Sequence, residues 1–129
     1  MSQQLFLAST PLHILNSVAI ASQTPSTPAC LWLIDQPIVE NNPYFDLIKS
    51  WHNSPFSEVR ISQGHIKGTK AKLENRKRVF AEVEQWVTRN EPGQLFTGND
   101  RRIEFQYAMH CATSQRSDVQ GIYMDEGTF

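Results

Sequence analysis

Short apolar runs, separated by longer stretches with helical periodicity, make up most of this chain. Continuous short runs of this kind are typical of strands that are covered on both faces of a sheet. They predict strands at residues 5–8, 29–34, 58–61, 94–97 and 119–124. The run at 58–61 alternates polar with apolar residues, so we expect it at an edge of the sheet.

Each segment between two predicted strands carries the signals of a helix. Thr10 is suited to cap a helix, and Pro11 suits the first helical position because no amide donor is needed there. We expect helices from residue 11 to the breaker at 22–28, at 43–51, at 69–90 and at about 101–115. The regular alternation predicts an α/β fold, a Rossmann-like open parallel sheet of about five strands with helices on both faces.

Composition and charge exclude several classes of protein. The 129 residues have room for one domain, and 40% hydrophobic residues suffice to build its core. Twelve Lys and Arg against thirteen Asp and Glu give a net charge of -1, which excludes a general attraction to nucleic acid. The two cysteines and four histidines lack the spacing of a metal site. No apolar run approaches the roughly 20 residues of a membrane span, so we expect a soluble, cytoplasmic protein.

Polar residues follow the predicted strands at their carboxyl ends, where open parallel sheets bind their ligands. They are Ser9 and Thr10, Asp35, Gly98-Asn99-Asp100, and Asp125-Glu126-Gly127. The adjacent acids Asp125 and Glu126 repel each other, which tends to raise the pKa of one carboxyl and suits a general base. Gly127 permits a tight turn and the close approach of a ligand. An ordinary polar turn is the alternative interpretation of this segment.

Half of the positive charge of the chain lies at, or just before, the amino end of the longest predicted helix. The residues are Lys67, Lys70, Lys72, Arg76, Lys77 and Arg78. The helix macrodipole disfavours cations at this end by roughly 0.3–1 kcal/mol each, a cost that an anionic partner would offset. A solvated helix face is the alternative interpretation.

Two familiar nucleotide-binding motifs are absent. The segment from Gly64 to Lys70 lacks the spacing and the Gly-Lys-Ser/Thr order of the Walker pattern. The first predicted strand leads into Ser9 and Thr10 without the glycines of a dinucleotide-binding turn, so no cofactor is predicted. His13 and His110 fall on predicted helices, and neither is assigned a catalytic role.

Three stretches together resemble the bacterial sialyltransferases that build lipooligosaccharide caps and polysialic acid capsules. They are Leu-Phe-Leu-Ala-Ser-Thr-Pro-Leu-His at 5–13, Gly-Asn-Asp-Arg-Arg at 98–102, and Tyr-Met-Asp-Glu-Gly-Thr at 123–128. The last stretch is similar to the acidic Asp/Glu-Asp/Glu-Gly motif of that family. The resemblance implies a GT-B arrangement of two facing Rossmann-like domains, of which residues 1–129 are the amino-terminal, acceptor-binding half.

The resemblance also implies how the chemistry of that family maps onto this chain. Transfer inverts the anomeric carbon without a metal, and Glu126, with Asp125 as the second choice, takes the proton of the acceptor hydroxyl. The acceptor glycan lies against Ser9, Thr10, Asn99, Asp100 and Gly127. CMP-sialic acid binds mainly to a second domain that carries a His-Pro motif. Because this sequence has no His-Pro dipeptide, we expect residues 1–129 to be inactive alone.

The same resemblance assigns partners to the basic residues and leaves two alternatives open. These residues attract an anionic glycan or the surface of the inner membrane, where the products of such enzymes meet lipid. In the first alternative the chain is a non-catalytic remnant of a truncated gene. In the second it is a stand-alone flavodoxin-like binding module, although receiver domains of that kind carry acids where this chain has Ser9 and Thr10.

Overall fold

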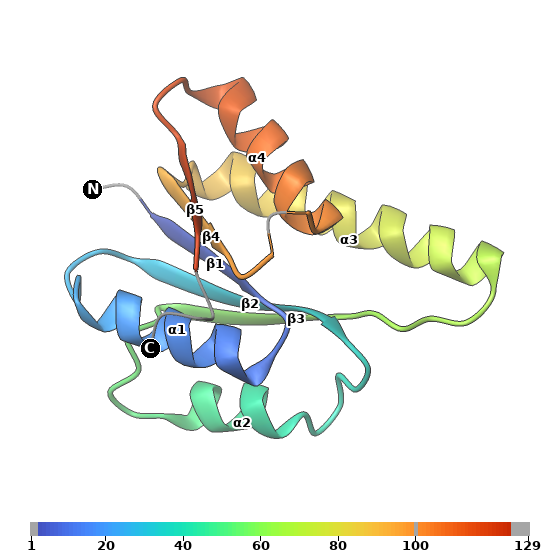
Figure 1. The fold of residues 1–129 in the computed structure, drawn as a ribbon, viewed down its shortest axis with the longest axis horizontal. Helices are drawn as coiled ribbons and strands as arrows, with labels where there is room; N and C mark the ends of the chain where they lie inside the picture. The colour runs from blue at the N-terminus through green and yellow to red at the C-terminus, as the bar shows by residue number, and fades with distance from the viewer. Residues whose placement is uncertain (1–2, 100, 125–129) are drawn as a thin grey trace.

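An open sheet of parallel strands forms the centre of the molecule (Figure 1). The computed structural model describes residues 3–99 and 101–124, and within them the sheet has five strands. They are β1 (Gln4–Ala8), β2 (Ala29–Gln36), β3 (Glu58–Gln63), β4 (Gln94–Thr97) and β5 (Gln120–Tyr123). Their order across the sheet is β3-β2-β1-β4-β5. The predicted α/β fold and the edge position of residues 58–61 are both confirmed.

The strand order separates two kinds of doubly wound sheet. Rossmann sheets have the order 3-2-1-4-5-6, whereas flavodoxin-like sheets have the order 2-1-3-4-5. The order found here matches the first five strands of the Rossmann arrangement. The flavodoxin-like alternative therefore does not fit this fold.

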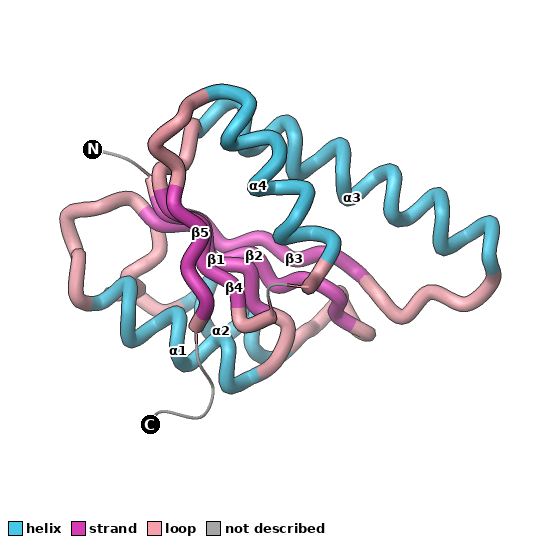
Figure 2. Tube along the Cα trace, turned by 45° about the horizontal axis from the view of Figure 1, so that its top comes forward, coloured by secondary structure: helices cyan, strands magenta, loops and turns pink. Residues whose placement is uncertain are grey.

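The described part of the chain has four helices, which cover both faces of the sheet (Figure 2). They are α1 (Pro11–Ser22), α2 (Pro43–Ser50), α3 (Thr69–Asn90) and α4 (Ile103–Gln115). Side chains alternate along β1, so Phe6 and Ala8 pack with α1 and α2, whereas Leu5 and Leu7 pack with α3 and α4. None of these helices is long and apolar enough to cross a membrane.

β2 continues two residues further than the sequence predicted. Its register with β3 is irregular between Leu33 and Gln36, and Asp35 has a left-handed φ of 55°. Such an irregularity inserts a residue and redirects the side chains around it. The polar Asp35 predicted the end of the strand, but the strand accommodates this residue and turns its carboxylate toward the edge of the sheet.

α4 begins two residues later than predicted. The side-chain oxygen of Asn99 accepts the amide of Arg101 at 3.0 Å, and the Arg102 amide donates to the Asn99 carbonyl at 3.2 Å. These bonds hold a turn before the helix starts at Ile103. The turn places two arginines at the carboxyl edge of the sheet.

Cys30 on β2 belongs to the core. Its side chain is fully buried, and burial raises the pKa of the thiol well above its ordinary value. A thiol that stays protonated is a poor nucleophile, so packing accounts for this cysteine.

Candidate functional site

The chain reverses its winding direction between β1 and β4. From β1 it proceeds outward to β2 and β3, and α3 then returns it to β4 on the other side of β1. Open α/β sheets bind ligands at such a point, outside the carboxyl ends of the strands. A cleft of about 580 Å³ lies there, and we call it the switch-point cleft. Its lining residues are Ser9, Thr10, His13, Gly98, Asn99, Arg101, Arg102 and Tyr123.

Three of the residues predicted to bind the acceptor meet in this cleft, namely Ser9, Thr10 and Asn99. Thr10 Oγ1 accepts the amide of His13 at 3.2 Å and so caps α1, as predicted. The backbone amide of Asn99 donates to Thr97 Oγ1 at 3.1 Å, which fixes the turn after β4. These bonds leave the hydroxyl proton of Thr10 and the side-chain NH₂ group of Asn99 to donate to a ligand.

His13 lies at the floor of the switch-point cleft, although its sequence context suggested no role. It is 4% exposed, and its Nδ1 atom lies 3.3 Å from the Ser9 amide nitrogen and 3.2 Å from Ser9 Oγ. Because the Ser9 amide donates to Nδ1, that nitrogen is an acceptor, and the Ser9 hydroxyl can donate to it too. The oxygen of Ser9 is then oriented to accept a hydrogen bond from a ligand. The four-residue spacing between Ser9 and His13 is the feature of the sequence from which this contact could have been predicted.

Gly98 allows the turn after β4 to approach the ring of His13. A Cβ atom at position 98 would collide with Cδ2 and Nε2 of the imidazole. The absence of a side chain at Gly98 is therefore a packing requirement of the cleft floor.

Four of the residues predicted to form the site are not among those that the structure describes. They are Asp100, Asp125, Glu126 and Gly127. Tyr123 at the end of β5 lines the switch-point cleft, and the Met124 amide donates to the Thr97 carbonyl at 2.7 Å. The ends of β1 and β5 therefore reach the same cleft, as the sequence predicted.

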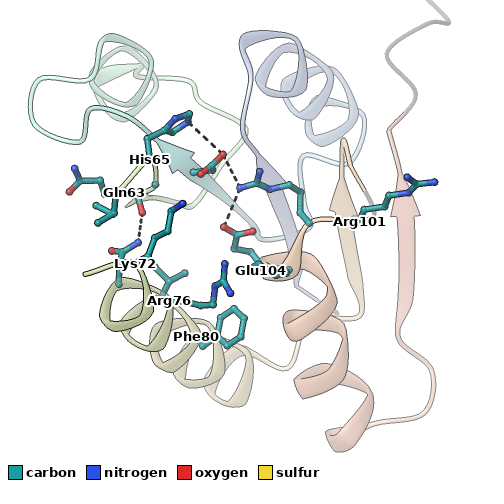
Figure 3. A pocket seen from close by; sticks show the side chains of 14 residues that line it. Gln63, His65, Lys72, Arg76, Phe80, Arg101 and Glu104 are labelled. Carbon is teal, nitrogen blue, oxygen red and sulfur yellow. Dashed lines mark hydrogen bonds and ion pairs between the residues drawn. The ribbon is translucent and has the colours of Figure 1, made fainter. Parts of the chain in front are cut away.

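A second cavity adjoins the switch-point cleft. We call it the basic cavity, and Figure 3 shows the residues that line it. It has a volume of about 320 Å³, and Arg101 and Arg102 line both hollows. Of the six basic residues predicted to meet an anionic partner, Lys72 and Arg76 on α3 line this cavity. The other four do not line it, namely Lys67, Lys70, Lys77 and Arg78. The structure therefore divides a group that is continuous in the sequence.

An ion-pair network fixes one wall of the basic cavity. Arg102 Nη2 lies 3.0 Å from Asp35 Oδ2 and 3.3 Å from Glu104 Oε2. His65 Nε2 lies 3.7 Å from the same oxygen of Asp35. Asp35 was recognised in the sequence as a strand-end residue, but its partners come from two distant segments and left no local signal.

Replacing Asp35 with asparagine tests this network. Asparagine tolerates the left-handed backbone of position 35, so Asp35→Asn chiefly removes the charge that pairs with Arg102. We expect the free energy of unfolding to fall by about 1 kcal/mol in low salt and by less in high salt, because both groups are partly exposed. Urea denaturation at the two salt concentrations measures the effect.

Asp118→Asn is the matched control, because Asp118 pairs with Arg116 two residues away in an exposed turn. We expect a smaller loss of stability there than at Asp35. An Asp35→Asn variant as stable as the original protein at both salt concentrations would show that the network does not hold the wall.

Comparison with known protein families, curated proteins and solved structures finds no match for this chain. Within residues 3–99 and 101–124, no group of three or more His, Cys, Asp or Glu side chains is placed to hold a metal ion.

Proposed function

We propose that this chain is the acceptor-binding half of a glycosyltransferase that moves sialic acid from CMP-sialic acid to a glycan hydroxyl. One observation carries the proposal. The three stretches that resemble bacterial sialyltransferases, 5–13, 98–102 and 123–128, are far apart in the sequence, yet each contributes residues to the switch-point cleft. Stretches that share a site are expected to share a ligand.

The side chains of the cleft suit a sugar. Ser9 is oriented to accept a hydrogen bond, whereas Thr10 and Asn99 can donate one, so hydroxyl groups find both kinds of partner. Tyr123 is 55% exposed and offers an aromatic face to the C–H groups of a pyranose ring. These groups would hold the acceptor with one hydroxyl directed toward the end of β5.

In the proposed reaction the acceptor oxygen attacks the anomeric carbon of sialic acid. The bond from that carbon to the phosphate oxygen of CMP breaks, and a carboxylate accepts the proton of the hydroxyl. Glu126 takes this proton in our proposal, and Asp125 is the second choice. A sugar hydroxyl is a weak nucleophile until its proton is removed, and a positioned base contributes about 10²–10⁴ in rate. The transfer is inverting and independent of metal, as in the family that the sequence resembles.

A second domain binds CMP-sialic acid, and the enzyme works in the cytoplasm at the surface of the inner membrane. Four basic residues outside the basic cavity are exposed and available to an anionic glycan or to that surface. They are Lys67, Lys70, Lys77 and Arg78.

Acceptor binding by the chain itself tests the proposal without requiring catalysis. We expect saturation-transfer NMR to detect binding of either lactose or an α2,8-linked oligomer of sialic acid. Ser9→Ala and Asn99→Ala should each weaken that binding about fivefold, the effect of losing one hydrogen bond. Thr113→Ala serves as the control, because Thr113 is exposed on α4 and does not line the cleft.

Two results would contradict the proposal. The first is that neither sugar binds to the protein. The second is that the sugars bind to the Ser9→Ala and Asn99→Ala proteins as tightly as to the original protein. Either result would remove the switch-point cleft as the acceptor site.

A further inference from the structure

The basic cavity has a charge pattern that acceptor binding in the neighbouring cleft does not explain. Lys72 and Arg76 from α3 and Arg102 from the turn before α4 line it together with the carboxylates of Asp35 and Glu104. In Figure 3, Lys72 and Arg76 extend toward the centre of this group, whereas the labelled Arg101 points away toward β5. Four cationic side chains therefore line the cavity, Arg101 among them, together with two carboxylates.

Lys72 and Arg76 have no counterion among the residues that the structure describes. Arg102 is held between Asp35 and Glu104 at 3.0 and 3.3 Å. Both carboxylates of the cavity pair with Arg102, and Asp35 also lies near His65, so neither carboxylate compensates Lys72 or Arg76.

This arrangement costs stability in the absence of a ligand. Lys72 and Arg76 are four positions apart and are neighbours on one face of α3, where like charges repel. A bound anion relieves the repulsion between the two side chains.

We propose that the basic cavity binds the phosphate group of a small phosphorylated solute. A phosphate monoester carries a charge of about −1.5 to −2 at neutral pH, which matches two uncompensated cations better than a carboxylate does. The planar guanidinium of Arg76 suits phosphate oxygens, and the ammonium of Lys72 acts as a point charge beside it. A volume of about 320 Å³ accommodates a phosphate with a small organic group.

The walls of the cavity are held in place by the fold itself. Asp35 and His65 both have a left-handed backbone, with φ of 55° and 56°, and backbone of this kind is concentrated at functional sites. Gly64 packs so closely on β2 that an added Cβ would lie 2.6 Å from Asp35 Cα. Asn75 Nδ2 donates to the Gln63 carbonyl at 2.9 Å and so ties α3 to the end of β3.

Titration with inorganic phosphate and with glucose 6-phosphate tests the proposal. We expect saturable shifts of the backbone amide signals of Ile66 and Ile103, which line the cavity. Lys72→Gln and Arg76→Gln should each weaken the affinity about tenfold, as expected for losing a hydrogen bond to a charged group. Lys70→Gln and Lys77→Gln remove the same charge from the same helix outside the cavity and should change the affinity less than about twofold.

Several outcomes would overturn the proposal. If these amides show no saturable shifts, the cavity does not bind phosphate. If the cavity and control variants lose the same affinity for phosphate, the binding is a general attraction between charges. Acetate that binds as tightly as phosphate would show that no phosphate is selected. Binding to phosphatidylglycerol vesicles that is lost in Lys72→Gln, without any response to phosphate solutes, would reassign the cavity to a membrane surface. Glycan binding depends on Ser9 and Asn99, so the two proposals fail independently.

Discussion

In the proposed enzyme, with a donor-binding half present, replacing Glu126 with glutamine is expected to lower the turnover of sialic acid transfer by about 10²–10⁴. Glutamine keeps the size and polarity of the side chain but cannot accept the proton of the acceptor hydroxyl. The KM values for acceptor and donor should stay nearly unchanged, because only an interaction of the transition state is lost. Steady-state kinetics with CMP-sialic acid and the acceptor measures both quantities.

Asp125→Asn is the control for Glu126→Gln. Position 125 is expected to orient the turn or to affect the charge of its neighbour, so its loss should slow turnover less than the loss at 126. If Asp125→Asn were the inactive variant and Glu126→Gln stayed active, the roles of the two acids would be reversed. If both variants stayed active, the acidic motif would be a polar turn and the catalytic part of the proposal would fail.

The inner strands β1 and β2 could be predicted because burial on both faces leaves a direct trace in the sequence. Residues 5–8 of β1 and 29–34 of β2 are continuous apolar runs with helices packed on both faces, and β3 alternates because it lies at the edge. Proline after a capping threonine marked the start of α1 in the same direct way. Each of these signals is local, so no knowledge of the tertiary structure was needed to read it.

The switch-point cleft was predictable in outline only. The rule that ligands meet the carboxyl ends of parallel strands identified Ser9, Thr10 and Asn99 from sequence order alone. His13 escaped this rule because it lies on a helix rather than after a strand. Its proximity to Ser9 Oγ follows from the first turn of α1, and its proximity to Gly98 depends on the pairing of β1 with β4.

The basic cavity could not be predicted as a whole from the sequence. The spacing of Lys72 and Arg76 does predict that they share a face of α3, and it places Lys70 and Lys77 on the opposite face. The opposite wall comes from Asp35, which the irregularity in β2 directs toward Arg102. Nothing near position 35 in the sequence indicates an irregularity of register, because it depends on how β2 pairs with β3.

Replacing Gly98 with alanine is expected to lower the free energy of unfolding by about 1–3 kcal/mol, the range for overpacking a well-packed site. The new Cβ would collide with the imidazole of His13, and that ring is 4% exposed and bonded through Nδ1 to Ser9. The ring can therefore make room only by giving up its contact with Ser9. Urea denaturation measures the loss of stability, and Ser9-dependent sugar binding should weaken in the same variant.

A double substitution separates this collision from other effects of alanine at position 98. His13→Ala alone should destabilise the protein, because it leaves a void at the floor of the cleft. In the Gly98→Ala, His13→Ala protein the added methyl group enters that void, so the combined loss should be smaller than the sum of the two single losses by about 0.5–3 kcal/mol. Strictly additive losses of stability would mean that the Cβ added at position 98 does not collide with the ring of His13. The imidazole would then have room to move, and it would not fix the orientation of the Ser9 hydroxyl.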